Sequence, residues 1–327
     1  DSEIIDINHA GTAMRFLTSY FAIQPGKEVV LTGSERMKQR PIGFLVDALR
    51  DLGADIEYLE NKGFPPLKIT GKNIVKSNVK ISADVSSQFI TSLILIGAKL
   101  PNGLNIELSG KITSRPYIEM TLQILKIIGI ETEFSGNKIS IKNHTFDDKK
   151  SNIFHYVVES DWSSASYFYS LSAISRKNIS LKSFNNHSYQ GDSALKEIYW
   201  ECFGVNTVTD IQEHTISLFP ETFIYPDSIR LNMNDCPDIA QTVCVTATAL
   251  KVPFELTGLA TLKVKETDRL LALQNELKKI GCETEISDDA IKSVNFTDPD
   301  ENIVIKTYHD HRMAMSFAPF SLIQNLE

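Results

Sequence analysis

The sequence lacks any apolar run as long as a membrane-spanning helix, which needs about 20 residues. The best candidate, residues 89–98, contains Thr91 and Ser92. The four cysteines include no CxxC pair, and there is no Walker A loop, GxGxxG or HExxH motif. These absences argue against a membrane protein, a disulfide framework, nucleotide binding and zinc chemistry. We therefore expect no metal, no cofactor, and a reducing, cytoplasmic location.

Positive charge is also scarce. The 327 residues include 33 Lys and Arg against 41 Asp and Glu, a net charge of −8. We therefore expect no broad attraction to nucleic acid or to an anionic membrane surface. The balance changes along the chain, from 19 basic and 17 acidic residues in 1–158 to 14 and 24 in 159–327. Length and charge predict two domains, 1–158 and 159–327, with the boundary in a strand at residues 154–158.

What the sequence does contain is an internal repeat of about 75 residues. Small-residue helices are predicted at five starts, which follow one another at steps of 75, 77, 74 and 74 residues: Gly11, Ser86, Ser163, Pro237 and His311. A second, more amphipathic helix is predicted near Arg40, Arg115, Gly191 and Lys265, at steps of 75, 76 and 74. Two independent features with one period make coincidence improbable.

One repeat can be followed through its hydrophobic periodicity. Strands are predicted at residues 78–82, 104–108, 131–134 and 138–141, and helices at 87–98 and 117–128. The unit is βαβαββ, and the fold class is α/β (α+β), with apolar helices packed inside and sheets outside. The chain holds about 4.4 such units, whereas two domains of three units need about 450 residues at the same period. We therefore expect the chain to be truncated.

Several helix starts could bind anions, because free N–H groups and the helix dipole attract negative charge there. Gly11 and Thr12 allow close approach to the backbone, and Ser86 and Ser87 add two hydroxyl groups, which suits a phosphate. Simple helix capping is the alternative at each single start. Arg40, Arg269 and Arg312 lie near these starts and could grip a carboxylate or phosphate, although a surface salt bridge is the alternative for any one of them.

Residues 265–269 form the densest charge cluster. On a helix, Lys265 and Arg269 would share a face and meet one anion, with Glu266 beside them as an acid or base; a solvated helix start is the alternative. Asp238 follows Pro237 at another helix start, where it is either a catalytic carboxylate or a cap. His311 and Arg312 open the last helix after Asp310, which could cap it. From these features alone the sequence predicts an anion-binding enzyme.

Seven motifs, in order along nearly the whole chain, resemble those of the 5-enolpyruvylshikimate-3-phosphate synthases, an enolpyruvyltransferase family. They are residues 10–15 (AGTAMR), 31–43 (LTGSERMKQRPIG), 85–89 (VSSQF), 114–117 (SRPY), 161–168 (DWSSASYF), 264–270 (VKETDRL) and 307–315 (TYHDHRMAM). The resemblance implies two domains of βαβαββ units and transfer of the enolpyruvyl group of phosphoenolpyruvate to the 5-hydroxyl of shikimate 3-phosphate, with release of phosphate, in the shikimate pathway of aromatic amino-acid biosynthesis.

The resemblance also implies roles for single residues. Ser86, Ser87 and Ser114 would hold the shikimate phosphate, and Gln88, Tyr117, Asp238 and Lys265 would lie along the ring. Gly11, Thr12, Arg40, Arg269 and Arg312 would belong to the binding site, mainly for phosphoenolpyruvate. Asp238 would take the proton of the 5-hydroxyl, Glu266 would exchange a proton with the methylene carbon, and His311 would line the site. Catalysis would thus fall to Asp238, Glu266, Lys265 and His311.

The chain departs from the family pattern at His9, Phe16 and Thr261, and it lacks the family's N-terminal Lys-Ser segment and C-terminal Lys. We therefore expect it to be truncated at both ends and inactive alone, and its parent to be a monomer. Two alternatives remain. One is the sister enolpyruvyltransferase that acts on UDP-N-acetylglucosamine, and the other is a non-catalytic anion-binding fragment of the same fold.

Overall fold

The computed structural model describes residues 3–84, 86–145 and 155–327. These divide into two compact units, Asp1–Tyr156 and Val157–Glu327, each with a hydrophobic core of its own. Among the described residues, every helix is too short or too polar to cross a bilayer. The division into domains 1–158 and 159–327 and the functions assigned to them stay predictions.

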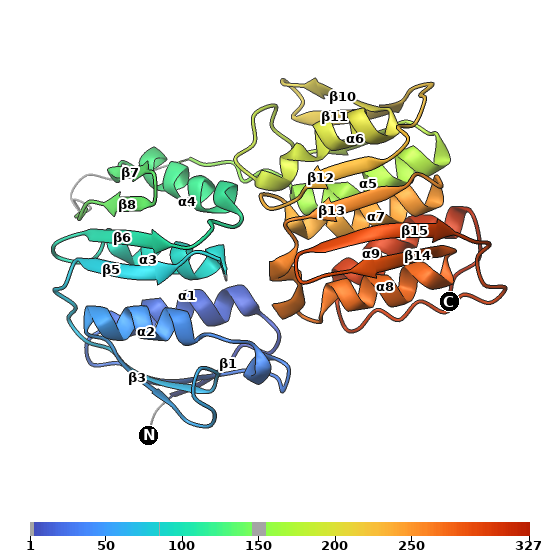
Figure 1. Cartoon of the computed structure of the whole chain (residues 1–327). Coiled ribbons are helices and arrows are strands. Elements are labelled where there is room, and N and C mark those ends of the chain that lie inside the picture. The colour runs from blue at the N-terminus through green and yellow to red at the C-terminus, as the bar shows by residue number, and fades with distance from the viewer. Residues whose placement is uncertain (1–2, 85, 146–154) are drawn as a thin grey trace. The chain divides into compact units, whose positions relative to one another are not determined.

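The first unit contains two complete βαβαββ repeats (Figure 1). Each sheet has one parallel strand pair followed by antiparallel pairs. In spatial order, the first sheet consists of β1 (Glu3–Asp6), β2 (Glu28–Thr32), β4 (Leu67–Thr70) and β3 (Asp55–Tyr58). The second consists of β5 (Asn78–Ser82), β6 (Leu104–Ser109), β8 (Lys138–Ile141) and β7 (Thr132–Ser135). The predicted repeat and fold class are therefore confirmed.

The second unit has one sheet of the same order and one that is shorter among the described residues. The complete sheet consists of β12 (Ile229–Asn232), β13 (Phe254–Thr257), β15 (Ala290–Phe296) and β14 (Cys282–Ile286). The shorter one consists of β10 (Val205–Asp210), β11 (Thr215–Pro220) and β9 (Ile179–Lys182). By analogy with the other three sheets, the place beside β9 belongs to the first strand of the repeat.

The predicted strand at residues 154–158 is wrong for its described part, because residues 155–158 form no strand; residue 154 lies outside the described residues. Ser160, two residues after that segment, is bonded in the same way as its counterpart in the next repeat. The Ser160 N–H donates to the Ser183 carbonyl oxygen at 2.6 Å, and the Met233 N–H donates to the Thr257 carbonyl oxygen at 2.8 Å after β12. The preceding Val157 and Val158 are 74% and 78% exposed. The apolar side chains at the end of the predicted strand are therefore not buried against a sheet.

The helices fall into two sets that alternate along the chain. The first helices of the repeats are α1 (Gly11–Ala22), α3 (Ser87–Gly97), α5 (Trp162–Ser175), α7 (Ala240–Ala249) and α9 (His311–Phe317). The second helices are α2 (Gly43–Leu52), α4 (Arg115–Ile127), α6 (Leu195–Phe203) and α8 (Arg269–Lys279). Short 3₁₀ helices at Gly191–Ala194 and Pro237–Ile239 precede α6 and α7.

The first helices of successive repeats pack on one another: α1 on α3, α5 on α7 and α7 on α9. Side-chain hydroxyl groups form hydrogen bonds between them. The Thr246 hydroxyl donates to Ser170 at 2.7 Å, and Thr242 lies 2.9 Å from Ser166 and 3.2 Å from Ser316. Small side chains let these helices approach closely, and these buried hydroxyls bond one another across successive repeats. This explains why the repeat is visible as a run of small residues.

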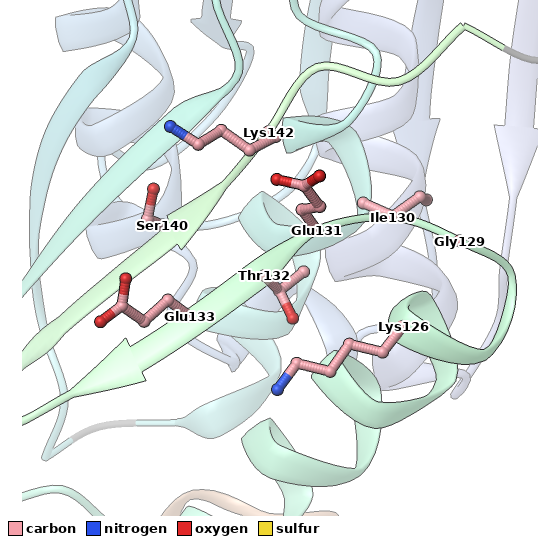
Figure 2. Close-up of a pocket in the computed structure, with 8 residues that line it drawn as sticks. All are labelled: Lys126, Gly129, Ile130, Glu131, Thr132, Glu133, Ser140 and Lys142. Carbon is pink, nitrogen blue, oxygen red and sulfur yellow. The ribbon is translucent and has the colours of Figure 1, made fainter.

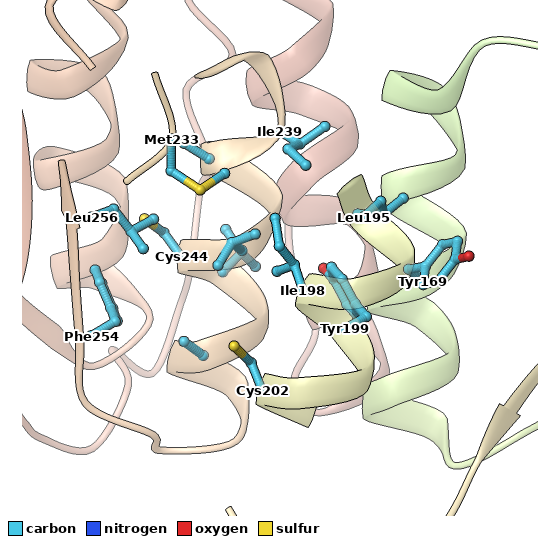
Figure 3. Close-up of a cluster of buried hydrophobic side chains, with 14 of the residues drawn as sticks. Tyr169, Leu195, Ile198, Tyr199, Cys202, Met233, Ile239, Cys244, Phe254 and Leu256 are labelled. Carbon is cyan, nitrogen blue, oxygen red and sulfur yellow. The ribbon is translucent and has the colours of Figure 1, made fainter. Parts of the chain in front are cut away.

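Figure 3 shows part of the core of the second unit, in which side chains of α5, α6, α7 and β13 form one buried hydrophobic cluster. The rings of Tyr169 and Tyr199 meet edge to face at 5.3 Å, and their hydroxyls bond Thr207 at 2.7 Å and Thr246 at 2.8 Å. All four cysteines are free and buried. Burial raises the pKa of the Cys236 thiol to about 12, so this cysteine is a small core residue and not a nucleophile.

Candidate active site

The second unit contains a network of ion pairs centred on Arg269, the first residue of α8. The Arg269 side chain is buried, and its three nitrogens each bind a different carboxylate. Nε lies 2.7 Å from Asp310, Nη1 lies 2.9 Å from Asp238, and Nη2 lies 2.7 Å from Glu266. A planar guanidinium with donors in fixed directions can hold three acceptors at defined positions. Arg269 therefore fixes the relative placement of these carboxylates.

The Asp238 carboxylate lies close to three cationic side chains of this unit. Besides Arg269, it lies 3.3 Å from the Lys265 ammonium and 3.7 Å from the Arg312 guanidinium. Its side chain is 28% exposed, so one carboxylate within reach of solvent faces three cations. Asp238 lies in the first turn of the 3₁₀ helix Pro237–Ile239, and its carboxylate is turned to these cations and not to the free N–H groups of that helix.

Lys265 and Arg269 meet at Asp238, but not in the way that the sequence predicts. Helix α8 begins only at Arg269, because the Asp268 side chain accepts the Leu271 N–H at 3.1 Å and caps the helix there. Lys265 precedes the helix, in extended backbone. The prediction that Lys265 and Arg269 share a helix face is therefore wrong. The fold brings the two cations together through the loop at residues 265–268.

Asp310 organises the start of α9, as the sequence predicts. Its Oδ1 accepts the Arg312 N–H at 2.9 Å, while Oδ2 binds Arg269, and its side chain is fully buried. Arg312 also donates from Nη1 to the Asp238 carbonyl oxygen at 3.4 Å. His311 is the first residue of α9, and its side chain is exposed.

The charges in this network shift one another's pKa values. Burial alone would raise the pKa of Asp238, but Lys265, Arg312 and Arg269 outweigh it and hold that pKa well below its usual range. Burial lowers the pKa of Lys265. For Arg312, burial is outweighed by Asp238 and Asp192, which raise its pKa. The result is an ionised carboxylate that is held among three cations.

Asp192 is a site carboxylate that the sequence prediction missed. It lies in the 3₁₀ helix Gly191–Ala194 and accepts a hydrogen bond from the Ser163 hydroxyl in the first turn of α5. Burial, followed by the negative charge of Asp238, raises the pKa of Asp192 to about 6. The sequence shows only that Asp192 follows Gly191, which matches Arg40 and Arg115 in the repeat, and that place alone does not indicate a role in the site.

We expect Asp192→Asn to stabilise the second unit at neutral pH. The folded-state pKa of about 6 lies above the unfolded value near 4, so the wild type loses stability as pH rises between these values. Asparagine can still accept the Ser163 hydroxyl but carries no charge. The gain should approach zero at about pH 4 and reach about 1–3 kcal/mol at pH 7–8.

Urea unfolding followed by tryptophan fluorescence measures this gain, because Trp162 and Trp200, the two tryptophans of the chain, both lie in the second unit. Asp288→Asn is the control, since Lys263 lowers the pKa of Asp288 and its removal should cause a small loss above pH 4. A gain for Asp192→Asn that does not depend on pH would contradict the prediction.

The first unit places two guanidinium groups over the start of α1. A Cβ atom on Gly11 would lie 2.6 Å from Arg15 Nη1 and 2.7 Å from Arg40 Nη1, so a larger residue at this position would displace both guanidinium groups. Arg15 also donates to Gln88 Oε1 at 2.8 Å, and the Gln88 amide donates to the Thr12 hydroxyl at 3.0 Å. The structure thus brings together four predicted binding residues, Gly11, Thr12, Arg40 and Gln88, and adds Arg15.

The predicted phosphate-binding serines lie at two helix starts of the same unit. Ser87 is the first residue of α3, and Ser86 precedes it in extended backbone. Ser114 stands before α4 with a φ of 49°, a left-handed conformation that non-glycine residues rarely adopt. Tyr117 lies in the first turn of α4.

The surface pocket shown in Figure 2 is separate from all of these residues. It has a volume of about 510 Å³ and lies between the end of α4 and the hairpin β7–β8, lined by Lys126, Gly129, Ile130, Glu131, Thr132, Glu133, Ser140 and Lys142. No predicted site residue lines it. Within the described residues, no group of three His, Cys, Asp or Glu side chains is arranged to hold a metal ion.

Comparisons with known proteins identify relatives along nearly the whole chain. The family model described as EPSP synthase (3-phosphoshikimate 1-carboxyvinyltransferase) matches residues 1–325. A 3-phosphoshikimate 1-carboxyvinyltransferase of Bacteroides fragilis (strain YCH46) is 44% identical over 324 residues, covering 98% of this chain and 77% of that protein. One of Haemophilus influenzae (strain Rd) is 38% identical over 333 residues, covering 98% and 73%.

Solved structures show the same fold. An EPSP synthase from Acinetobacter baumannii superposes with a TM-score of 0.67 at 23% identity, covering 98% of this chain and 72% of that one. The enolpyruvyl transferase NikO from Streptomyces tendae gives 0.60 at 11% identity, covering 94% and 67%.

Proposed function

The chain belongs to the EPSP synthase family, the 3-phosphoshikimate 1-carboxyvinyltransferases of the shikimate pathway, and we propose that the residues described above carry this reaction. The substrates are phosphoenolpyruvate and shikimate 3-phosphate, both polyanions. The names of the curated relatives favour this acceptor over UDP-N-acetylglucosamine. A monomer and a cytoplasmic location stay predictions.

The observation that carries the proposal is the single guanidinium that holds Asp238 and Glu266. We assign Asp238 as the base for the 5-hydroxyl and Glu266 as the group that exchanges a proton with the methylene carbon. Arg269 binds both carboxylates, at 2.9 Å and 2.7 Å, so their separation is set by one rigid group. Fixed placement of two proton-transfer groups is what such a reaction needs.

A base surrounded by three cations is weak while the site is empty, because those cations lower the pKa of Asp238. Binding of a phosphate or carboxylate group to Lys265 and Arg312 neutralises part of that positive charge. The pKa of Asp238 then rises, and its affinity for the hydroxyl proton increases. The anionic substrates would thus activate the base that acts on them, which supports the pairing of Asp238 with Lys265 and Arg312.

We assign the shikimate phosphate to Ser86, Ser87 and Ser114, with Gln88 and Tyr117 nearby, and phosphoenolpyruvate to Gly11, Thr12, Arg40, Arg269 and Arg312. Exposed N–H groups and hydroxyls at the start of α3 suit a phosphate. The two guanidinium groups over Gly11 suit a carboxylate or phosphate. His311, exposed at the start of α9, is placed to meet solvent or ligand.

The test is a transfer assay on a chimera, because the chain covers 77% of the Bacteroides fragilis relative. The parts of that relative that the chain does not match are joined to the chain, and phosphate release is measured with each acceptor. We expect phosphate release with shikimate 3-phosphate and none with UDP-N-acetylglucosamine. Folded chimera that binds shikimate 3-phosphate in calorimetry without releasing phosphate would favour a non-catalytic binding module.

A further inference from the structure

The segment that carries Asp310, His311 and Arg312 reaches α9 through an unusual turn. Tyr308 and His309 both have left-handed backbones, with φ of 55° and 54°. Neither is glycine, so this conformation is unfavourable for both and persists only when neighbouring groups hold it. The groups that hold this turn therefore determine where α9 begins.

Helix α8 holds the segment at two points. Arg269 binds Asp310 at the first point, as described above. Glu276 provides the second, and it lies seven residues later, which places it on the same face of the helix two turns away. Its Oε1 accepts the Tyr308 hydroxyl at 2.7 Å, and its Oε2 accepts the Lys306 N–H at 3.0 Å.

Glu276 is completely buried, which is unusual for a carboxylate. Its third donor is the Lys279 ammonium at 2.6 Å, which also donates to the Val304 carbonyl oxygen at 2.8 Å. The carboxylate is thus fully satisfied, and every contact outside α8 goes to residues 304–308. Burial, followed by the bond to Glu276, raises the pKa of Tyr308, so its hydroxyl remains a donor at neutral pH.

We propose that Glu276 and Tyr308 are positioning residues that fix the turn at 308–309 and thereby set the place of Arg312 relative to Asp238. The proposal rests on the proposed function for its effect on phosphoenolpyruvate. The hydrogen bonds of Glu276 and Tyr308 described above go to residues other than Asp238, Lys265 and Arg312. Both residues therefore act through the segment that leads to Arg312.

The first test is Tyr308→Phe, which removes one hydroxyl and leaves the buried Glu276–Lys279 pair in place. Tyr169→Phe is the matched control, because it removes a hydroxyl bond of the same 2.7 Å length elsewhere in the second unit. In the chimera we expect Tyr308→Phe to raise the KM for phosphoenolpyruvate roughly 3–10-fold with little change in kcat. The control should leave both constants unchanged.

The second test is hydrogen exchange of the chain, which does not depend on activity. We expect Tyr308→Phe to increase the rate of amide hydrogen exchange several-fold in residues 306–313. This segment includes the Arg312 N–H, which donates a hydrogen bond to Asp310. Exchange in β12 to β15 should stay as in the wild type, and the control should leave residues 306–313 unchanged. Glu276→Gln should give a larger increase, since its amide cannot accept the Lys306 N–H and keep its other bonds.

The outcomes separate the two proposals. Unchanged exchange in residues 306–313 would overturn the positioning role, whatever the activity. Faster exchange with an unchanged KM would show that Tyr308 is structural only and would also overturn it. A wild-type chimera that is folded but transfers nothing would refute the proposed function, and hydrogen exchange would still decide whether Glu276 and Tyr308 hold the turn.

Discussion

Asp238→Asn is expected to lower kcat about 10²–10⁴-fold in the chimera, the range typical of losing a general base. Asparagine keeps the shape of the side chain but cannot accept the proton of the 5-hydroxyl. The KM values should change little, because Lys265, Arg269 and Arg312 remain to bind the anionic substrates. In the variant, these three cations are no longer paired with the Asp238 carboxylate. Steady-state rates with each substrate varied in turn give both constants.

Asp235→Asn is the control for this prediction, because Asp235 is exposed and lies three residues away in the sequence. It should leave kcat and KM at wild-type values. Tryptophan fluorescence shows whether the variants keep the second unit folded. If Asp238→Asn turned over at a near-normal rate and had only a lower melting temperature, Asp238 would be a structural ion-pair partner and the assignment as base would be wrong.

The fold was predictable because the same pattern of strands and helices occurs several times along the sequence. A strand such as Asn78–Ser82 alternates cleanly, and the small residues of α3 and α7 occur at equivalent places in successive repeats. Each occurrence supports the others, so an error in one repeat is corrected by the next. The strand expected at residues 154–158 shows the limit of this reasoning, since its described residues, 155–158, form no strand. An apolar segment can predict a strand, but it cannot guarantee that a neighbouring strand pairs with it.

The candidate site was predictable in its members but not in its contacts. Lys265 and Arg269 are four residues apart, and helical spacing was a reasonable explanation of their pairing. The cap at Asp268 shows that a loop brings them together instead. Asp192 was missed because its importance depends on the approach of Asp238 and Arg312, which are distant in the sequence. Burial and long-range charge are properties of the folded chain, and spacing cannot reveal them.

The central position of Arg269 leads to the largest effect on stability that we expect. Arg269→Met should lower the free energy of unfolding of the second unit by about 3–5 kcal/mol, the usual result of removing one partner of a buried ion pair. Methionine fills much of the volume, so the loss comes from charge. Asp310 would stay fully buried with its bond to the Arg312 N–H, but without the guanidinium. Urea unfolding followed by tryptophan fluorescence reports this unit specifically.

Two features separate this prediction from a general loss of packing. First, the destabilisation should be smaller at pH 4 than at pH 8, because burial without a cationic partner raises the pKa of a carboxylate, which then becomes protonated and neutral as the pH falls. Second, Lys263→Met removes a pair of nearly the same length, 2.6 Å against 2.7 Å, from an exposed part of the same unit, and it should cause little change because solvent screens that pair. Equal losses for the two variants, or a loss for Arg269→Met that is the same at pH 4 and pH 8, would show that Arg269 acts through packing and not as the charged centre of the network.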